Sequence, residues 1–193
     1  MSKEVFQMVE ELNQEDLQTQ LALQCAPLLT GIKVSNLLSV KNQSEEDIFE
    51  MFRETRISVK LIYQSEEKRI YLLYQRKELE AYLNTEEVAE TMKMFGYEEL
   101  EPDSICEELK KRYACYMEEK GAFPHEIGLL LGYPVEDVLG FIRHQGKNYL
   151  YTGYWKVYGN VVEAIALFEA YNQAKERVIR MLSHGIEIRR MLA

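Results

Sequence analysis

The sequence predicts an α+β fold: a small mixed or antiparallel sheet of about four strands, packed with several helices, in one globular domain over residues 1–193. Three observations lead to this prediction. Apolar residues recur at helical spacing in several segments, residues 57–64 and 69–75 alternate as strands do, and no repeat or low-complexity linker divides the chain. A chain of 193 residues, 47% of them hydrophobic, is long enough to bury one sizeable core.

The N-terminal part is expected to be helical and then extended. Apolar residues at i, i+3, i+4 and i+7 between positions 5 and 12 mark one helical face. A second helical segment is expected to end before Pro27, because a proline disfavours helical conformation in the residue that precedes it. The aliphatic run that follows predicts a strand within residues 28–40.

The middle of the chain carries the clearest strand signals. Ser44 is placed to cap a short helix, and the three acids that follow it suit the helix dipole. Residues 57–64 and 69–75 then alternate apolar and polar side chains around a short polar connection. This pattern predicts an antiparallel hairpin.

Helices are expected to dominate the rest of the chain. We predict a short helix over 76–84, a second helix capped by Thr85, a long helix beginning at Pro102, and a last long helix. Cys106 and Cys115 lie nine positions apart on the long helix, which places them on opposite faces. They are therefore not expected to form a disulfide or to share a metal ion.

Residues 123–158 concentrate turn-forming and aromatic residues, including the only tryptophan of the chain. Two short helices joined by a Gly-Tyr-Pro turn are predicted here, as a helix-turn-helix-like corner at 124–145 with Pro124 in the first helical position. DNA binding is disfavoured, because the turn that would face the base edges presents Glu136 and Asp137. The corner is expected to be structural.

Residues 147–158 predict one aromatic strand. Strand alternation places Tyr151 and Trp155 on one face, and Tyr154 and Lys156 on the other. The single glycine between them removes a side chain among bulky neighbours, which would open a slot for a flat ligand. Aromatic residues also suit strands and cores without any ligand. Both interpretations stay open at this point.

The charge of the chain excludes some classes of partner. The formal net charge is −9, from 32 acidic and 23 basic residues, which disfavours nucleic acid and anionic membrane. No apolar run approaches the length of a membrane span, and acids interrupt the N-terminus where a signal peptide needs an apolar core. Three widely spaced cysteines are typical of a reduced, cytoplasmic protein with free thiols.

Residues 85–120 are strongly acidic, with eleven acids and five bases. Such a surface would suit a basic protein partner. A solvated helix face is the commoner reason for such a composition, and we favour it.

Three blocks of sequence resemble those of a known family: QCAPLLTGIKVSNLL at 24–38, FPHEIGLLLGYPVEDVLGFI at 123–142 and GYWKVYG at 153–159. They are similar to the signature blocks of the domain-of-unknown-function family 3793, which is found mainly in anaerobic bacteria. The resemblance covers most of the chain. It implies no activity, cofactor or catalytic residue, because none is established for that family.

An enzymatic hypothesis pairs Cys25 with His125, since a cysteine and a distant histidine are the minimum for thiol catalysis. Glu126 or Asp137 would orient the imidazole, and Lys33 would stabilise an anion. The alternative is that Cys25 is a small buried residue and that His125 caps its helix.

A binding hypothesis ranks slightly above catalysis. The aromatic strand and the helical corner would hold a protein partner or a small planar ligand such as haem or flavin. No phosphate-binding glycine loop and no zinc motif is present in the sequence, so no metal site is expected. The candidate ligand-binding residues are Lys33, Tyr151, Tyr154, Trp155 and Lys156.

Overall fold

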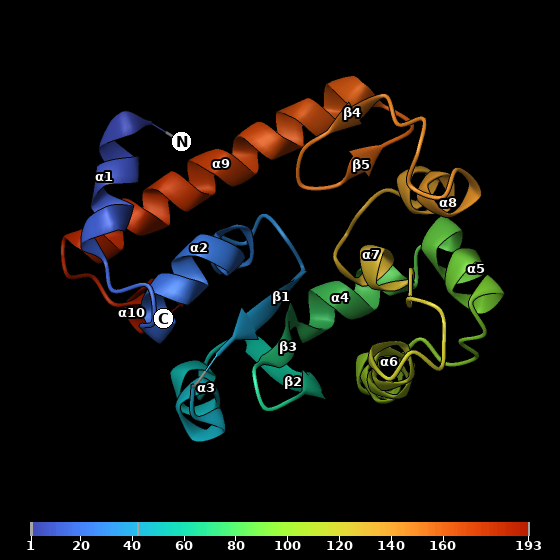
Figure 1. The fold of residues 1–193 in the computed structure, drawn as a ribbon, viewed down its shortest axis with the longest axis horizontal. Coiled ribbons are helices and arrows are strands. Elements are labelled where there is room, and N and C mark those ends of the chain that lie inside the picture. Colours follow the sequence, from blue (N-terminus) through green and yellow to red (C-terminus); the bar gives the residue numbers. More distant parts are fainter. Residues whose placement is uncertain (1, 42, 193) are drawn as a thin grey trace. The chain divides into compact units, whose positions relative to one another are not determined.

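The computed structural model describes residues 2–41 and 43–192 and has the predicted α+β architecture, with helices and two antiparallel sheets of three and two strands (Figure 1). The chain forms two compact units. The first unit is Met1–Gln75 with Glu169–Ala193, and the second unit is Arg76–Phe168. That the whole chain acts as one domain stays a prediction.

The first unit combines a three-stranded sheet with helices from both ends of the chain. The helix α9 (Val161–Ser183) begins in the second unit and ends in the first. The other elements of the first unit are α1 (Lys3–Glu11), α2 (Leu17–Leu29), β1 (Ser35–Val40), α3 (Glu45–Phe52), β2 (Ile57–Gln64), β3 (Arg69–Gln75) and α10 (Ile188–Leu192).

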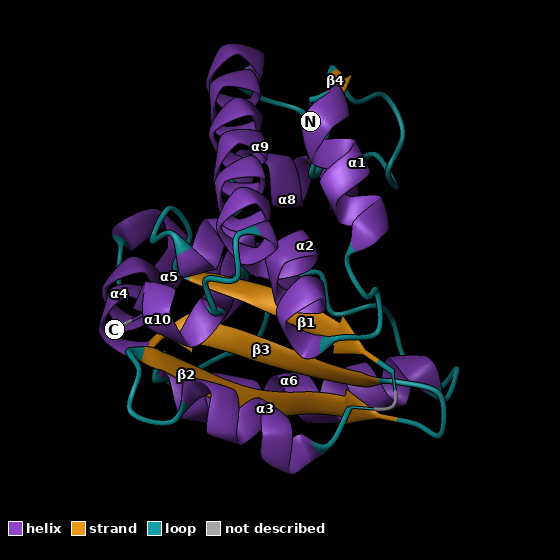
Figure 2. Ribbon diagram, turned by 90° about the vertical axis from the view of Figure 1, so that its left-hand side faces the viewer, coloured by secondary structure: helices purple, strands orange, loops and turns teal. Residues whose placement is uncertain are grey.

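The sheet of the first unit has β3 at its centre, with β1 and β2 antiparallel on either side (Figure 2). The strands β2 and β3 form the predicted hairpin, which the Ser65 N–H closes by donating to the Lys68 carbonyl at 2.9 Å. The register shifts between Leu61 and Tyr63, so β2 carries a bulge near its end.

The core of the first unit lies on the sheet face that carries Tyr71 and Leu73. The helix α2 packs against β1, and α3 packs against β2. Leu21 of α2 and Ile48 of α3 are fully buried in this core. Ser44 caps α3 as predicted, because its hydroxyl accepts a hydrogen bond from the Asp47 N–H.

The prediction that α2 ends before Pro27 is wrong. The helix continues through Pro27 to Leu29, and the Thr30 N–H still donates to the Ala26 carbonyl at 3.0 Å. A proline within a helix costs about 3 kcal/mol. The burial of Pro27 and of the last turn in the core offsets that cost. Because the helix is longer, the strand predicted within residues 28–40 is confined to β1.

The second unit is mainly helical. Among the residues that the structure describes, no helix in either unit is long and apolar enough to cross a membrane. The elements of the second unit, besides the start of α9, are α4 (Arg76–Leu83), α5 (Glu86–Met94), α6 (Pro102–Met117), α7 (Ile127–Leu130), α8 (Val135–Arg143), β4 (Tyr151–Thr152) and β5 (Lys156–Val157).

The helices α7 and α8 form the tight corner expected between residues 124 and 145. Gly132 adopts a left-handed conformation with φ of 73°, which ends α7. A Cβ atom at Gly128 would lie 2.9 Å from Val138, so the glycine allows the two helices to approach closely. Pro124 does not occupy the first helical position, because residues 124–126 form a turn and α7 begins at Ile127.

The prediction of one aromatic strand over residues 147–158 is wrong. The segment folds back on itself as the short hairpin β4–β5, in which Tyr151 pairs with Val157. The Gly153 N–H donates to the Trp155 carbonyl at 3.0 Å and closes the turn. Sequence alternation alone did not reveal this reversal.

Candidate functional site

The hairpin β4–β5 is anchored by the carboxylate of Asp137, which is 3% exposed in the first turn of α8. One oxygen, Oδ2, accepts from the Trp155 indole N–H at 2.7 Å. The other, Oδ1, accepts from the N–H groups of Tyr158 at 2.7 Å and Gly159 at 3.0 Å. Hydrogen bonds to a charged acceptor are the stronger kind, so this carboxylate fixes both the indole and the chain that leaves the hairpin.

Asp137 therefore does not face solvent at the start of α8. The prediction that two carboxylates of this turn would repel nucleic acid is wrong for Asp137, because its carboxylate is buried against the hairpin. Glu136 remains partly exposed there. From the sequence, Asp137 was expected to repel nucleic acid or to orient an imidazole. That its carboxylate anchors the hairpin was not predicted.

Trp155 is a core residue of the second unit, at 8% exposed. Its ring stacks on Tyr133 at 4.7 Å between centroids and meets Phe168 edge-on at 4.5 Å. A Cβ atom at Gly153 would lie 2.3 Å from the Phe168 ring. The slot expected beside Gly153 is therefore filled by Phe168, and haem or flavin would have to displace that ring to enter it.

Four side chains on and beside the hairpin remain exposed. We call them the hairpin patch: Tyr149 at 43%, Leu150 at 64%, Tyr151 at 42% and Tyr154 at 37% exposed. Two of them also pack inward, since Tyr151 and Tyr154 contact the Phe168 ring at 6.2 and 5.6 Å between centroids. Two of the four large side chains of the patch are thus held in place by packing on Phe168.

The charges around the hairpin patch are positive. The chain has no Asp or Glu between Val138 and Val162, but it has Arg143, Lys147 and Lys156. The Lys156 ammonium donates to the Gly146 carbonyl at 2.7 Å and lies 5.0 Å from the centre of the Tyr149 ring. Lys156 is thereby held at the edge of the patch.

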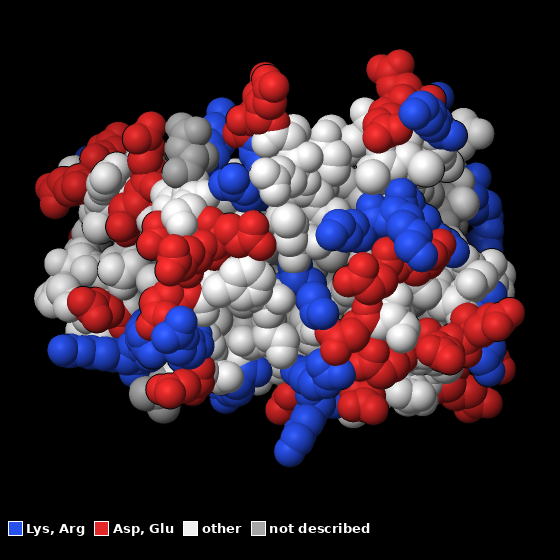
Figure 3. Space-filling view, turned by 90° about the horizontal axis from the view of Figure 1, so that it is seen from below, with Lys and Arg blue, Asp and Glu red and all other residues white. Residues whose placement is uncertain are grey.

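The face shown in Figure 3 carries acidic side chains beside basic ones, so no field of one sign covers it. Within the acidic segment 85–120, Glu108 pairs with Lys111 and Arg112, and Glu118 pairs with Lys120. Pairing of this kind is typical of a solvated helix face, which is the interpretation favoured from the sequence.

Glu126, predicted to orient an imidazole, is buried in a network of its own. Its Oε1 accepts from the Tyr97 hydroxyl at 3.0 Å and from Arg112 Nη1 at 3.1 Å. Arg112 also donates to the Phe95 carbonyl at 2.7 Å. Burial, followed by the charge of Glu126, raises the pKa of Tyr97, so its hydroxyl stays protonated and continues to donate. No local pattern in the sequence indicated this long-range network.

His125 lies between two aromatic rings. Its imidazole is 5.3 Å from the Phe123 ring and 5.5 Å from the Phe141 ring, between centroids. Burial lowers the pKa of His125, which favours the neutral imidazole at neutral pH. An open groove of about 390 Å³ lies beside Glu126, and its lining includes Cys115 and Phe123.

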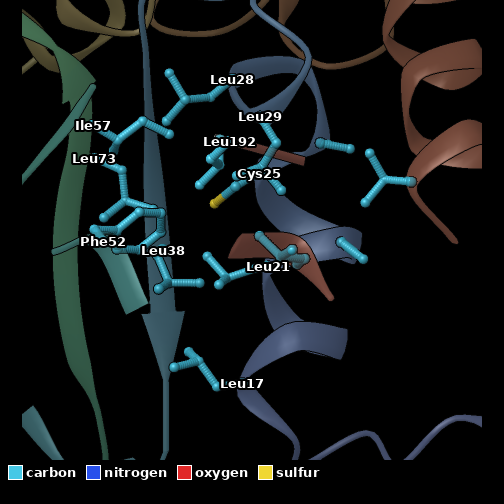
Figure 4. Packing of buried hydrophobic residues seen from close by; sticks show 14 of the residues in the cluster. Leu17, Leu21, Cys25, Leu28, Leu29, Leu38, Phe52, Ile57, Leu73 and Leu192 are labelled. Carbon is cyan, nitrogen blue, oxygen red and sulfur yellow. The ribbon is translucent and has the colours of Figure 1, made fainter. Parts of the chain in front are cut away.

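Cys25 is fully buried among leucines in the first unit (Figure 4). Burial raises the pKa of its thiol to about 12, whereas a nucleophilic cysteine needs its thiolate. The Asn36 amide nitrogen lies 3.6 Å from the sulfur, and the Asn36 amide oxygen accepts from Lys33 at 3.1 Å. The structure thus links Cys25 and Lys33 through Asn36, as part of the first unit.

Lys33 is itself nearly buried, at 9% exposed. Desolvation lowers the pKa of its ammonium to about 8. His125 and Glu126 belong to the second unit, so the proposed pairing of His125 with Cys25 stays a prediction. Cys106 is buried and Cys115 is exposed, which confirms that they lie on opposite faces of α6.

The family comparison agrees with the resemblance of the three sequence blocks. The model of a family described as a protein of unknown function, DUF3793, matches residues 21–192. No curated protein and no solved structure matches the chain.

Proposed function

The chain belongs to the DUF3793 family, whose function is unknown, and we propose that it is a binding module that uses the hairpin patch to contact another protein. The partner surface would be apolar where it meets the patch and acidic around it. The cytoplasm is the compartment that we propose for this contact, on the basis of the odd number and wide spacing of the three cysteines in the sequence.

The observation that carries this proposal is the exposure of four large apolar side chains on one anchored hairpin. Large exposed apolar side chains gathered on one short segment are typical of interaction sites. Tyrosine is enriched in interfaces, because its ring buries a large area at a low cost in conformational entropy. The Asp137–Trp155 hydrogen bond and the Phe168 contacts restrict the hairpin before binding, which lowers that cost further.

The charge of the partner follows from Arg143, Lys147 and Lys156. Three cations against the exposed acid Glu136 beside Gly159 favour an acidic partner and increase the rate of encounter. Three cations are few for a nucleic-acid site, and the net charge of −9 opposes one. We therefore favour an acidic protein over single-stranded nucleic acid, although both would accept stacked aromatic side chains.

Affinity capture from native cytoplasm tests the proposal when it is run with matched variants. The double variant Tyr151→Ser/Tyr154→Ser removes half of the patch, and Met94→Ser removes a 75%-exposed apolar side chain elsewhere in the second unit. We expect wild type and Met94→Ser to retain the same partner and the double variant to lose it. The purified partner should bind about tenfold more weakly to Lys147→Glu.

Two outcomes would overturn the proposal. In one, the double variant captures the same proteins as wild type. In the other, a fluorescent single-stranded oligonucleotide binds the wild-type protein at physiological salt and does not bind the double variant. That result would assign the patch to nucleic acid.

A further inference from the structure

The two outer strands of the three-stranded sheet differ in how their free edges are treated. The edge of β1 is closed by the side chain of Gln24, which imitates a neighbouring strand. Its Nε2 donates to the Ser39 carbonyl at 2.9 Å, and its Oε1 accepts from the Ser39 N–H at 2.9 Å. The other edge belongs to β2.

The register shows which groups of β2 point outward. The Gln75 N–H donates to the Val34 carbonyl at 2.9 Å, so the backbone N–H and C=O groups of Gln75 point toward β1. Ile57 of β2 lies opposite Gln75, so the backbone groups of Ile57 point away from β3. Alternation then places the N–H and C=O groups of Val59 and Leu61 on the outer edge. Within 2–41 and 43–192, the Ile57 N–H is bonded to Thr55 Oγ1 at 3.2 Å, and no residue bonds the outward groups of Val59 and Leu61.

A groove of about 500 Å³ lies between this edge and α3. Its apolar part includes Phe49, which is 43% exposed, and Val59, which is partly buried. Three carboxylates and one guanidinium surround the apolar part. The lining consists of Glu45, Glu46, Phe49, Glu50, Phe52, Arg53, Ile57 and Val59.

We propose that the edge of β2 accepts an extended segment of a partner protein in which apolar residues alternate with lysine or arginine. The backbone of the segment would bond the outward groups of Val59 and Leu61 and add a fourth strand to the sheet. Its apolar side chains would fill the groove, and its cations would meet Glu45 and Glu46. The bulge after Leu61 limits the added strand to a short segment.

Charge decides between this partner and a second copy of the chain. Two copies paired through β2 would bring two sets of the same acids together, in a protein whose net charge is −9. A basic segment meets no such repulsion. The inference concerns the first unit and a basic partner, so it is independent of the hairpin patch, which lies in the second unit and favours an acidic one.

Fluorescence anisotropy with a short capped peptide of alternating lysine and valine tests the inference. Val59→Pro removes one outward N–H while leaving the bonds between β2 and β3, and it should weaken binding about tenfold or more. Glu46→Lys should weaken binding to a similar extent. The matched control is Glu87→Lys, because Glu87 is an exposed acid at the same position of α5 as Glu46 is of α3, and it should leave binding unchanged.

A second peptide keeps the test decisive if Val59→Pro folds poorly. The same sequence, N-methylated along both backbone edges, keeps its charge but cannot pair as a strand through either edge, and it should bind about tenfold more weakly. Equal binding of the two peptides to the wild-type protein would overturn the inference. A concentration-dependent dimer that Val59→Pro abolishes would also overturn it, because the edge would then serve a second copy.

Discussion

The three cysteines differ in their surroundings, and this difference predicts their order of reaction. Cys25 is fully buried with a pKa raised to about 12, whereas Cys115 is exposed on α6. At neutral pH, iodoacetamide should modify Cys115 first and Cys25 last, because alkylation needs an accessible thiolate. Peptide mass spectrometry over a time course measures the order. Modification of Cys25 ahead of Cys115 would instead support the thiol-enzyme hypothesis.

The lowered pKa of Lys33 predicts that the free energy of unfolding rises with pH. Its pKa falls from the ordinary 10.5 to about 8 in the folded protein, so above about pH 8 the unfolded chain binds more protons than the folded one. The free energy of unfolding should therefore increase by about 1 kcal/mol between about pH 8 and pH 9, relative to the variant Lys33→Met. Above pH 9 the raised pKa of Cys25 acts in the opposite direction, because the unfolded thiol ionises first.

Urea unfolding of both proteins across this range measures the effect. A wild-type stability that follows Lys33→Met in parallel at every pH would show that the Lys33 ammonium is not desolvated in the folded protein.

At the scale of elements, the hairpin β4–β5 depends on the absence of a side chain at Gly153. A methyl group there would lie 2.3 Å from the Phe168 ring, so Gly153→Ala should destabilise the protein by about 1–3 kcal/mol. The fluorescence of Trp155, the only tryptophan, reports the transition because its ring contacts Phe168. In Gly153→Ala/Phe168→Leu the loss should be smaller than the sum of the single losses. Strictly additive losses would contradict the packing described for the hairpin.

Elements whose formation depends on local sequence patterns were predictable from the sequence. The strands β2 and β3 follow from alternation, and the cap at Ser44 follows from its position before three acids. Pro27 was misjudged because its cost is local, whereas the burial that offsets it depends on the whole core. The hairpin was missed because its reversal depends on Asp137 and Phe168, which are distant in sequence from its turn.

The candidate site was predictable only in part, for the same reason. An aromatic segment at residues 149–158 was evident from composition, but alternation could not separate exposed Tyr151 and Tyr154 from buried Trp155. The burial of Glu126 against Tyr97 and of Asp137 against the hairpin depends on tertiary contacts that no local pattern encodes.

If residues 1–193 form one domain, the whole chain should unfold in one cooperative transition. Trp155 fluorescence reports the second unit, and protection of Cys25 from alkylation reports the first unit in a variant that carries Cys106→Ala and Cys115→Ser. In urea, the two probes should give the same midpoint, because a two-state protein unfolds as one. Separate midpoints would show that the two units are independent domains.

Site-specific photocrosslinking in the cytoplasm shows whether the hairpin patch binds a protein partner. A benzophenone amino acid at Tyr151 places the reactive group on the patch, and the same residue at Met94 places it on an exposed part of α5. We expect one discrete crosslinked protein from position 151, absent from position 94 and lost when Lys147→Glu is added. No product from position 151, or the same products from both positions, would contradict it.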